Sequence, residues 1–425
     1  MSILASNYEV FELKSEGKDP INVQGKTAVF EYFESIFMPY ISARMVIVDA
    51  GDGVNYPPEI DRQERTGSIF NAYAIKGGEE VKFRFANSSG ILDFSKKPLI
   101  VKSSANIKKE SNRDVMTLEL VSDFYNKNES SQVGERLNGK YSDSLKSLLR
   151  ANNITFDEKN IEPTSNSGEY MGNSNKLSDV IVDIAKKASP AKDPPGFFFY
   201  ENQKGHNFKS IESLVKQKPF NPDRPYFQSE VMTSGLVDGH NDYKVAKFDM
   251  IRNQDLGSLY DSGSLVSRIN VWDPKTQVYS EKITGLEDLK LSSIGSFKIV
   301  PDNFKSFDFS KTYWHILDNG TMSPKVNEKP KESEKYIESD SQTRYNILLS
   351  RIIKVQIPCN FCLKVGDMLK FVFDPVTTDS KVQGPEPNQS GNYLVIDLCH
   401  YCDPKQSYTT MLMVRDSLGK DSNTN

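Results

Sequence analysis

The 425-residue chain is poor in the residues on which most catalytic and metal sites depend. It has four cysteines, four histidines and two tryptophans. No apolar run approaches the roughly 20 residues that a membrane-spanning helix needs. The first residues turn polar at once, without the basic start and long apolar core of a secretory signal. We therefore expect no membrane insertion, no secretory signal and little histidine chemistry.

The chain also lacks an excess of charge of one sign. Fifty-three Lys and Arg residues stand against 57 Asp and Glu residues, which gives a net charge of −4. A dedicated nucleic-acid-binding protein normally carries a basic domain, so this balance argues against one. The length corresponds to about three domains at roughly 150 residues each.

Motifs for catalysis or nucleotide binding are missing. The stretch Gly134–Lys140 reads GxxxxGK, but Tyr141 follows where a phosphate-binding loop needs Ser or Thr to hold Mg²⁺. The residues before it are polar and not typical of a strand, so we expect no nucleotide site. His206, His240 and His315 lie in unrelated polar or turn-like contexts, and we interpret them as structural.

The four cysteines form the one specific motif, because they occur as two CxxC pairs, Cys359 with Cys362 and Cys399 with Cys402. Four thiolates from two such pairs can make a closed tetrahedral zinc site, which would be structural and not catalytic. Positions i and i+3 of a flat strand face opposite ways, so the hypothesis requires both pairs to lie at turns. Buried free thiols and disulfides are the alternatives, and disulfides are disfavoured in a cytosolically assembled protein.

Period-two patterns predict strands at both ends of the chain. Arg44–Asp49 is a short apolar strand, and every second residue from Val81 to Phe85 is apolar. Such strands continue to about Tyr125. In the middle, the apolar residues of Leu177–Ala188 recur at helical spacing. Strands return from Tyr226, and we expect a helix around 344–353 before the last ones.

Ten stretches, taken in order, resemble one family, the baseplate hub (tail hub) proteins of contractile-tailed bacteriophages of the T-even-like type. The stretches are Ile41–Asp52, Ile75–Phe85, Asp114–Glu129, Val133–Leu149, Leu177–Ala188, Gly196–Gln217, Gly263–Tyr279, Ile357–Phe371, Ser390–Tyr401 and Tyr408–Gly419. The four cysteines depart from the pattern of the family, so the resemblance does not support a role for them.

The resemblance implies an α+β, β-rich fold, with two similar small β-barrel tube domains and two mixed α/β decorating domains. The expected domains are a first tube-like barrel at 1–125, a mixed α/β domain at 126–224, a second barrel from 225–285 and 340–425, and an inserted peripheral domain at 286–339.

The resemblance also implies a function. Such hubs are non-enzymatic homotrimers whose six similar units give pseudo-sixfold symmetry. The hollow trimer would join a hexameric tail tube to a trimeric central spike and contact neighbouring baseplate proteins. DNA would pass through its channel without specific binding. The expected location is the tail baseplate of the virion, after assembly in the host cytoplasm. A hub of a related contractile injection machine and a tail-associated cell-wall hydrolase are the alternatives.

Overall fold

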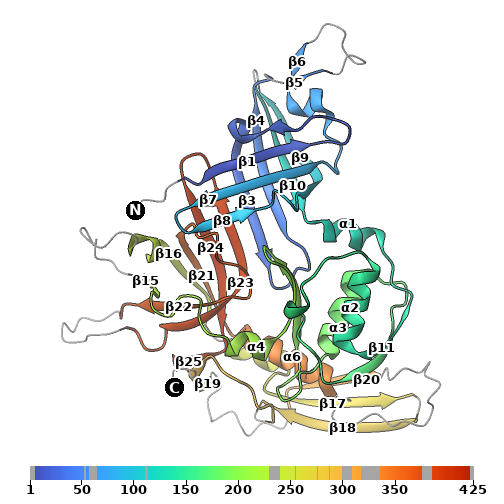
Figure 1. The fold of residues 1–425 in the computed structure, drawn as a ribbon. Coiled ribbons are helices and arrows are strands. Elements are labelled where there is room, and N and C mark those ends of the chain that lie inside the picture. The colour runs from blue at the N-terminus through green and yellow to red at the C-terminus, as the bar shows by residue number, and fades with distance from the viewer. Residues whose placement is uncertain are drawn as a thin grey trace.

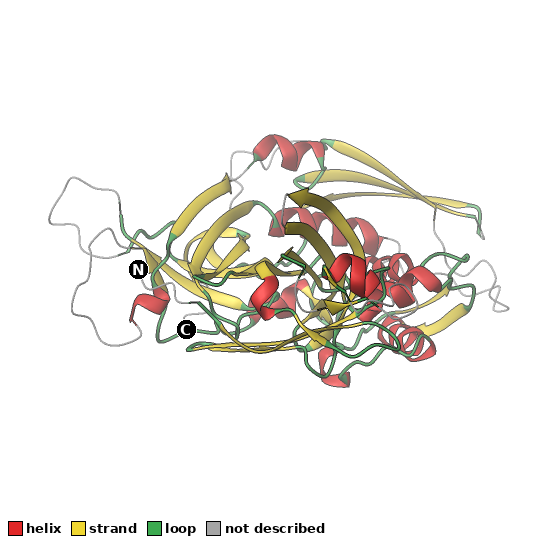
Figure 2. Ribbon diagram, turned by 90° about the horizontal axis from the view of Figure 1, so that it is seen from above, coloured by secondary structure: helices red, strands yellow, loops and turns green. Residues whose placement is uncertain are grey.

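The structure is a computed structural model. It describes residues 5–51, 54–56, 65–110, 113–228, 240–253, 255–274, 276–286, 288–298, 309–316, 336–375 and 385–421. Most of these residues lie in or between strands, with short helices beside them (Figure 2). No helix of the described ranges is long and apolar enough to cross a membrane.

A first unit of the main sheet comes from the N-terminal part of the chain. Its six principal strands are β1 Asn7–Lys14, β3 Thr27–Ser35, β4 Ser42–Asp49, β7 Glu80–Asn87, β9 Leu99–Glu110 and β10 Arg113–Val121. The short strands β2 Ile21–Asn22 and β8 Gly90–Asp93 pair with β1 and β7. Alternate side chains of β7 are buried, as the period-two pattern predicts. Beyond β4 lies the small pair β5 Val54–Asn55 and β6 Thr66–Gly67.

A second unit comes from the C-terminal part. Its six strands are β15 Tyr226–Gln228, β16 Lys247–Asn253, β21 Arg351–Pro358, β22 Met368–Phe373, β23 Gly391–Cys402 and β24 Ser407–Arg415. The two units belong to one sheet, because β3 of the first pairs with β23 of the second. In Figure 1 the blue and red strands therefore run together through the centre of the molecule. One apolar core spans both units.

The two units have the same strand order. The first reads β1-β7-β9-β10-β4-β3, and the second reads β15-β22-β23-β24-β21-β16. When the six strands of each unit are numbered in chain order, both orders are 1-4-5-6-3-2. The units differ at one pairing, since β15 runs parallel to β22 whereas β1 runs antiparallel to β7. A duplicated topology is therefore present, although no sequence repeat is visible.

A mixed α/β section lies between the units and has its own apolar core. Its helices and strands are α1 Asp123–Ser130, β11 Arg136–Lys140, α2 Tyr141–Ala151, β12 Ser167–Met171, α3 Leu177–Lys187, β13 Phe197–Asn202, β14 Gly205–Ser210 and α4 Ile211–Lys216. Helix α3 buries the apolar stripe that its sequence predicts.

The connection from β16 to β21 forms a separate layer. It contains α5 Leu256–Asp261, β17 Val266–Asp273, β18 Val278–Gly285, β19 Gly295–Lys298, β20 Lys311–Ile316 and α6 Ile337–Leu348. Strands β18, β17 and β20 form a three-stranded sheet, and β19 pairs with β25 Ser417–Asp421. Residues 225–285 are thus divided, because β15 and β16 join the main sheet while β17 and β18 do not.

The β-rich α+β class is confirmed, but two details of the prediction differ from the structure. The described pairings form an open, branched sheet, and no closed barrel is formed among the described strands. The helix expected around 344–353 is α6, which ends at Leu348, and β21 begins at Arg351. The β-branched residues Ile352, Ile353 and Val355 pack well on a pleated sheet, which explains the early switch to strand.

Candidate functional site

The joint between the two units is an antiparallel pairing of β3 with the C-terminal half of β23. Residues Phe30–Ser35 of β3 lie opposite Asp397–Cys402 of β23. The N-terminal residues of β23, Gly391–Leu394, pair instead with β22. Strand β23 therefore uses one of its edges twice, first for a strand of its own unit and then for a strand of the other unit.

The equivalent strand of the first unit, β9, uses only half of the same edge. Leu99 and Ile100 pair with β7, and backbone hydrogen bonds link Val101 to the turn before β7. Beyond Val101, no described strand pairs with this edge of β9. The same is true of the outer edge of β16, the strand of the second unit that is equivalent to β3. Among the described strands, the edge of β9 beyond Val101 and the outer edge of β16 are therefore both without a paired strand.

Burial agrees with this description of the edges. Side chains of β3 and β23 alternate between buried and half-buried at their joint. On the free edges, by contrast, Ile107 of β9 is 44% exposed and Ile251 of β16 is 56% exposed. Lys108 and Lys109 follow Ile107, and charged residues on an edge strand protect it from indiscriminate pairing. The two edges therefore carry exposed apolar side chains that a further strand would cover. The charged residues beside them limit unwanted pairing.

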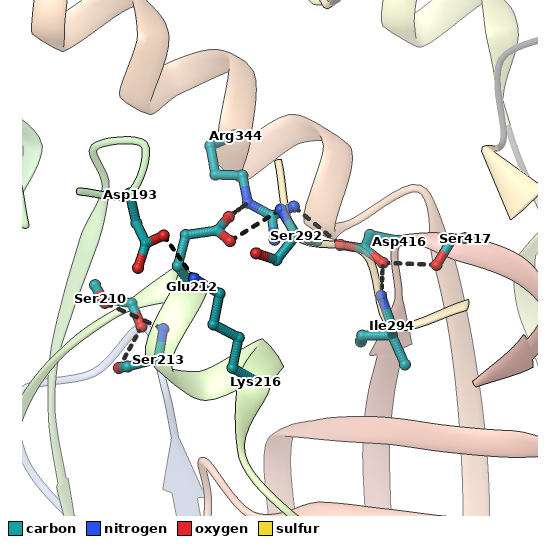
Figure 3. Close-up of polar contacts among 10 residues, drawn as sticks. All are labelled: Asp193, Ser210, Glu212, Ser213, Lys216, Ser292, Ile294, Arg344, Asp416 and Ser417. Atoms are coloured by element: carbon teal, nitrogen blue, oxygen red, sulfur yellow. Dashed lines mark hydrogen bonds and ion pairs between the residues drawn. The ribbon is translucent and has the colours of Figure 1, made fainter. Parts of the chain in front are cut away.

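A buried ionic junction holds the inserted layer, the mixed section and the second unit together (Figure 3). The Arg344 guanidinium of α6 donates to Glu212 of α4, with Nε and Oε1 2.6 Å apart, and to Asp416 after β24, with Nη1 and Oδ2 3.0 Å apart. All three side chains are almost fully buried. Ser292 donates its amide to Glu212, and Ile294 donates its amide to Asp416. Every member of the junction is therefore hydrogen-bonded, as a buried charge requires.

A second buried acid ties both units to the mixed section. Glu34 of β3 accepts hydrogen bonds from Tyr32 Oη at 2.7 Å, from the backbone N–H of Gln203 at 2.6 Å and from the backbone N–H of Val365 at 2.8 Å. Burial raises the pKa of Glu34 above its ordinary value, and these three hydrogen bonds oppose the rise. Since Gln203 and Val365 belong to different sections, the carboxyl group fixes their positions relative to the main sheet.

A cavity of about 410 Å³ lies between the first unit and the mixed section. Glu201 of β13 and His206 of β14 line it, with Oε1 and Nε2 3.6 Å apart. Burial raises the pKa of Glu201 to about 7. Burial also lowers the pKa of His206 to about 3, helped by Lys97 and Lys127. Glu201 accepts hydrogen bonds from Ser122 and from the Ile41 amide, so it links the mixed section to the first unit.

Replacing Glu201 with glutamine is expected to change how stability depends on pH. A carboxyl whose pKa rises from an ordinary value near 4.3 to about 7 in the folded chain stabilises the fold at low pH. That contribution is lost as the pH rises through 7. The unfolding free energy of the wild type should therefore fall relative to Glu201→Gln by about 3 kcal/mol between pH 4 and pH 8. Chemical denaturation at several pH values measures this difference, and a flat difference would contradict the assignment.

The structure does not gather the four cysteines into one cluster. Cys359 and Cys362 lie at a turn after β21, as expected, but Cys399 and Cys402 lie inside β23 and not at a turn. Cys359 and Cys402 contact each other and are buried, while Cys362 Sγ donates to the Ser89 carbonyl at 3.0 Å. All four are free thiols. Within the described residues, no three His, Cys, Asp or Glu side chains are grouped so as to hold a metal ion.

The electrostatics of these thiols differ. Burial opposes the ionisation of Cys359, but its hydrogen bonds with Cys402 and His400 outweigh this effect and lower the pKa of Cys359 to about 5. Burial raises the pKa of Cys399 to about 12, and the contact with Cys359, followed by burial, raises that of Cys402. Thiols of raised pKa are poor metal ligands and poor nucleophiles.

The zinc hypothesis stays a prediction, and it expects close to one zinc per chain. Metal analysis of protein purified without chelators, with Cys399→Ser as the matched variant, tests it. An absence of zinc together with four thiols titratable in denaturant would instead assign buried free thiols.

The other candidate residues are placed as follows. His206 is buried beside Glu201, and His315 Nε2 lies 2.9 Å from Ser339 Oγ of α6. His240 begins a short 3-10 turn, and its side chain lies outside the described residues. Most of the GxxxxGK stretch forms β11, and α2 begins directly after it at Tyr141, whose ring packs against Gly168 of the pairing strand. That aromatic contact gives the motif a structural role.

Comparisons with known proteins identify the fold. No family model matches the chain, and no curated protein matches it. A tail protein from Neisseria meningitidis MC58 superposes with a TM-score of 0.55 and 9% identity, over 96% of this chain and 97% of that one. The 43 kDa tail protein of prophage MuSo2 from Shewanella oneidensis gives a TM-score of 0.51 and 8% identity, over 96% and 98%. The chain has the fold of phage tail proteins.

The tail-protein fold covers nearly the whole chain, so the duplicated sheet and its decorating sections form one architecture. Among the described strands, the edges of β9 and β16 that lack a partner are places where this architecture could accept a further strand. Sequence reasoning missed both edges, because alternation predicts a strand but not which of its edges lacks a partner. The duplication, by contrast, was expected, because the resemblance to tail hubs implies two similar tube domains.

Proposed function

We propose that the chain is the structural hub of a phage tail baseplate. Three copies form a hollow adaptor of pseudo-sixfold symmetry that joins a hexameric tail tube to a trimeric central spike. In this arrangement the three chains, with two units each, supply six similar tube segments. The mixed section and the inserted layer lie outside and contact neighbouring baseplate proteins.

One observation carries the proposal: the two units share a strand order and are joined in a way that leaves two complementary edges free. Inside the chain, the second strand of one unit, β3, pairs with the fifth strand of the other, β23. Two equivalent positions have no partner among the described strands. They are the outer edge of β16, the second strand of the second unit, and the distal half of β9, the fifth strand of the first unit. Repeating the internal joint between copies would pair β16 of one copy with β9 of the next.

Such a contact is head-to-tail, and a head-to-tail contact that closes produces a ring. A ring of three chains contains six units, which suits a sixfold tube on one side and a threefold spike on the other. Each closing contact also removes an edge that would otherwise remain open to aggregation. The two tube segments of a chain become parts of a closed wall only when neighbouring chains complete them.

The charge balance suits a channel through which DNA moves. Each Lys or Arg contact with a phosphate adds affinity and would slow the passage. A chain with 53 basic and 57 acidic residues, and a net charge of −4, provides a wall without strong attraction for DNA. The proposed role needs no catalytic group.

Two measurements test the proposal. Light scattering of the purified chain, alone and with its spike protein, should give three times the 48.0 kDa mass of one chain. A low-resolution map of the complex should show a central hole. A monomer that persists at high concentration and with the spike, or an assembly closed at its centre, would contradict it.

The related role in another contractile injection machine would use the same ring. The attached tube and its genetic neighbours distinguish the two settings. A cell-wall hydrolase would instead lyse purified peptidoglycan and lose that activity on a single Asp or Glu substitution.

A further inference from the structure

The outer face of the three-stranded sheet β18-β17-β20 carries an unusual set of side chains. The register places three cross-strand rows on it: Ile283, Arg268 and Thr312; Glu281, Asn270 and Trp314; and Tyr279, Trp272 and Ile316. Both tryptophans of the chain are therefore on one face of one small sheet. We call Trp272, Tyr279, Ile283, Trp314 and Ile316 the aromatic face.

The aromatic face is exposed, although the sheet has a buried side. Ile269 and Val271, which alternate with the residues of the outer face along β17, pack with Tyr336 in a small apolar core beside α6. The sheet therefore needs no further cover to be held in place. On the outer face, Trp314 is 70% exposed and Ile316 is 76% exposed. Contiguous exposed apolar side chains of this size mark interaction surfaces in soluble proteins.

The polar groups of this face are already paired with one another. Arg268 Nε lies 3.0 Å from Glu281 Oε1, and the guanidinium also stacks 4.3 Å from the centre of the Phe309 ring. The Tyr279 hydroxyl donates to Asn270 Oδ1 at 2.7 Å. The charges cancel within the face, so it offers no net attraction to phosphates or to an anionic membrane. Its paired polar groups leave little for the hydroxyls of a glycan.

We propose that the aromatic face is a docking site for a second, different protein of the tail tip, one that presents an apolar and uncharged surface. This inference rests on the proposed function for the identity of the assembly in which the partner is found and for the exclusion of a second copy as the occupant. Trp, Tyr and Arg are the residues that most often supply the binding energy of protein interfaces. The centres of protein interfaces are also typically depleted of charged residues.

A second copy of the chain does not fit this face. A copy that used the same face in return would make a twofold contact, whereas the free edges of β9 and β16 build a head-to-tail ring. Figure 1 shows β17 and β18 at the lower end of the molecule, apart from β9 and from β16. The face therefore stays available when neighbouring copies occupy those edges.

A photo-cross-linking experiment tests the proposal in assembled particles. A photo-reactive benzoylphenylalanine replaces Trp314 in the full chain, and irradiated particles are analysed by mass spectrometry. We expect one main adduct, with a polypeptide of different sequence and through apolar residues of that polypeptide. Adding Ile316→Lys should lower the adduct yield at least tenfold. Adding Val182→Lys, which places the same charge on an exposed apolar position of α3, should leave the yield unchanged.

Other results overturn the docking site. These are an adduct with a second copy of the chain, an adduct with lipid or glycan, an absence of adducts, or an equal loss with both lysine variants. The mass of the purified complex is measured in parallel for each variant. If a variant lost the trimer, the result would count against the proposed ring. If a variant lost the adduct but kept the trimer, the result would concern the aromatic face alone. In the purified chain, whose only tryptophans are Trp272 and Trp314, quenching of tryptophan fluorescence by acrylamide checks that the face is exposed before docking.

Discussion

Replacing Ile251 with lysine is expected to convert the proposed trimer into monomers without unfolding the chain. Ile251 lies on β16 and is 56% exposed in the single chain, so the substitution costs little there. In the ring, the neighbouring strand would cover this position, and the loss of one buried isoleucine is worth roughly 2 kcal/mol per contact. A ring with three such contacts would lose roughly 6 kcal/mol, or about four powers of ten in its assembly constant.

Sedimentation over a dilution series measures this effect. Ile107→Lys, on the free half of β9, should act like Ile251→Lys, because the two residues lie on opposite sides of the same proposed contact. Val182→Lys is the matched control, since Val182 is 43% exposed and lies on α3, away from both edges. An undiminished trimer in both edge variants would refute the β9–β16 contact. Equal dissociation of the control would show a non-specific effect of added charge.

Replacing Arg344 with methionine is expected to destabilise the chain by about 3–5 kcal/mol, because it leaves Glu212 and Asp416 buried without a counter-charge. Methionine keeps an apolar stem like that of arginine but loses both ion pairs and the hydrogen bond to the Ser292 carbonyl. The junction connects α6, α4 and the end of β24 (Figure 3). We therefore expect the inserted layer and the mixed section to loosen together.

Chemical denaturation followed by circular dichroism, with hydrogen exchange to locate the loosened segments, measures the change. Arg150→Met provides the control, because Arg150 also pairs with an acid, Glu158, at 2.5 Å, but both side chains are about 60% exposed. An exposed pair of this kind contributes at most about 1 kcal/mol. If the two variants destabilised the chain equally, the buried junction would have no special role.

Local patterns predicted much of the fold. The alternation in Val81–Phe85 becomes β7, and the helical stripe of Leu177–Ala188 becomes α3, because each pattern matches the period of the element that buries it. The helix expected at 344–353 was extended too far, since Arg344 and the β-branched residues after Arg351 belong to different elements. The second CxxC pair was expected at a turn, but the turn begins after Cys402, at Asp403.

The candidate site could not be predicted in the same way, because its parts are distant in the sequence. Arg344 is 132 residues from Glu212 and 72 residues from Asp416. The free edges of β9 and β16 are defined by which strands do not pair, and pairing depends on the whole sheet. The exposure of the two tryptophans could not be predicted either. The alternation in β17 predicts that the strand has two faces, but it does not say which face α6 covers.

The joint between β3 and β23 also limits the ways in which assembly can go wrong. Because two tube segments are covalently linked, any closed ring must contain an even number of them, and five- or seven-segment rings are ruled out. In a wall of six tube segments, half of the contacts between segments form when each chain folds. These contacts do not cost the translational freedom that separate molecules lose on association. In the proposed ring only three encounters between molecules remain, so the polypeptide itself would help to set the diameter of the channel.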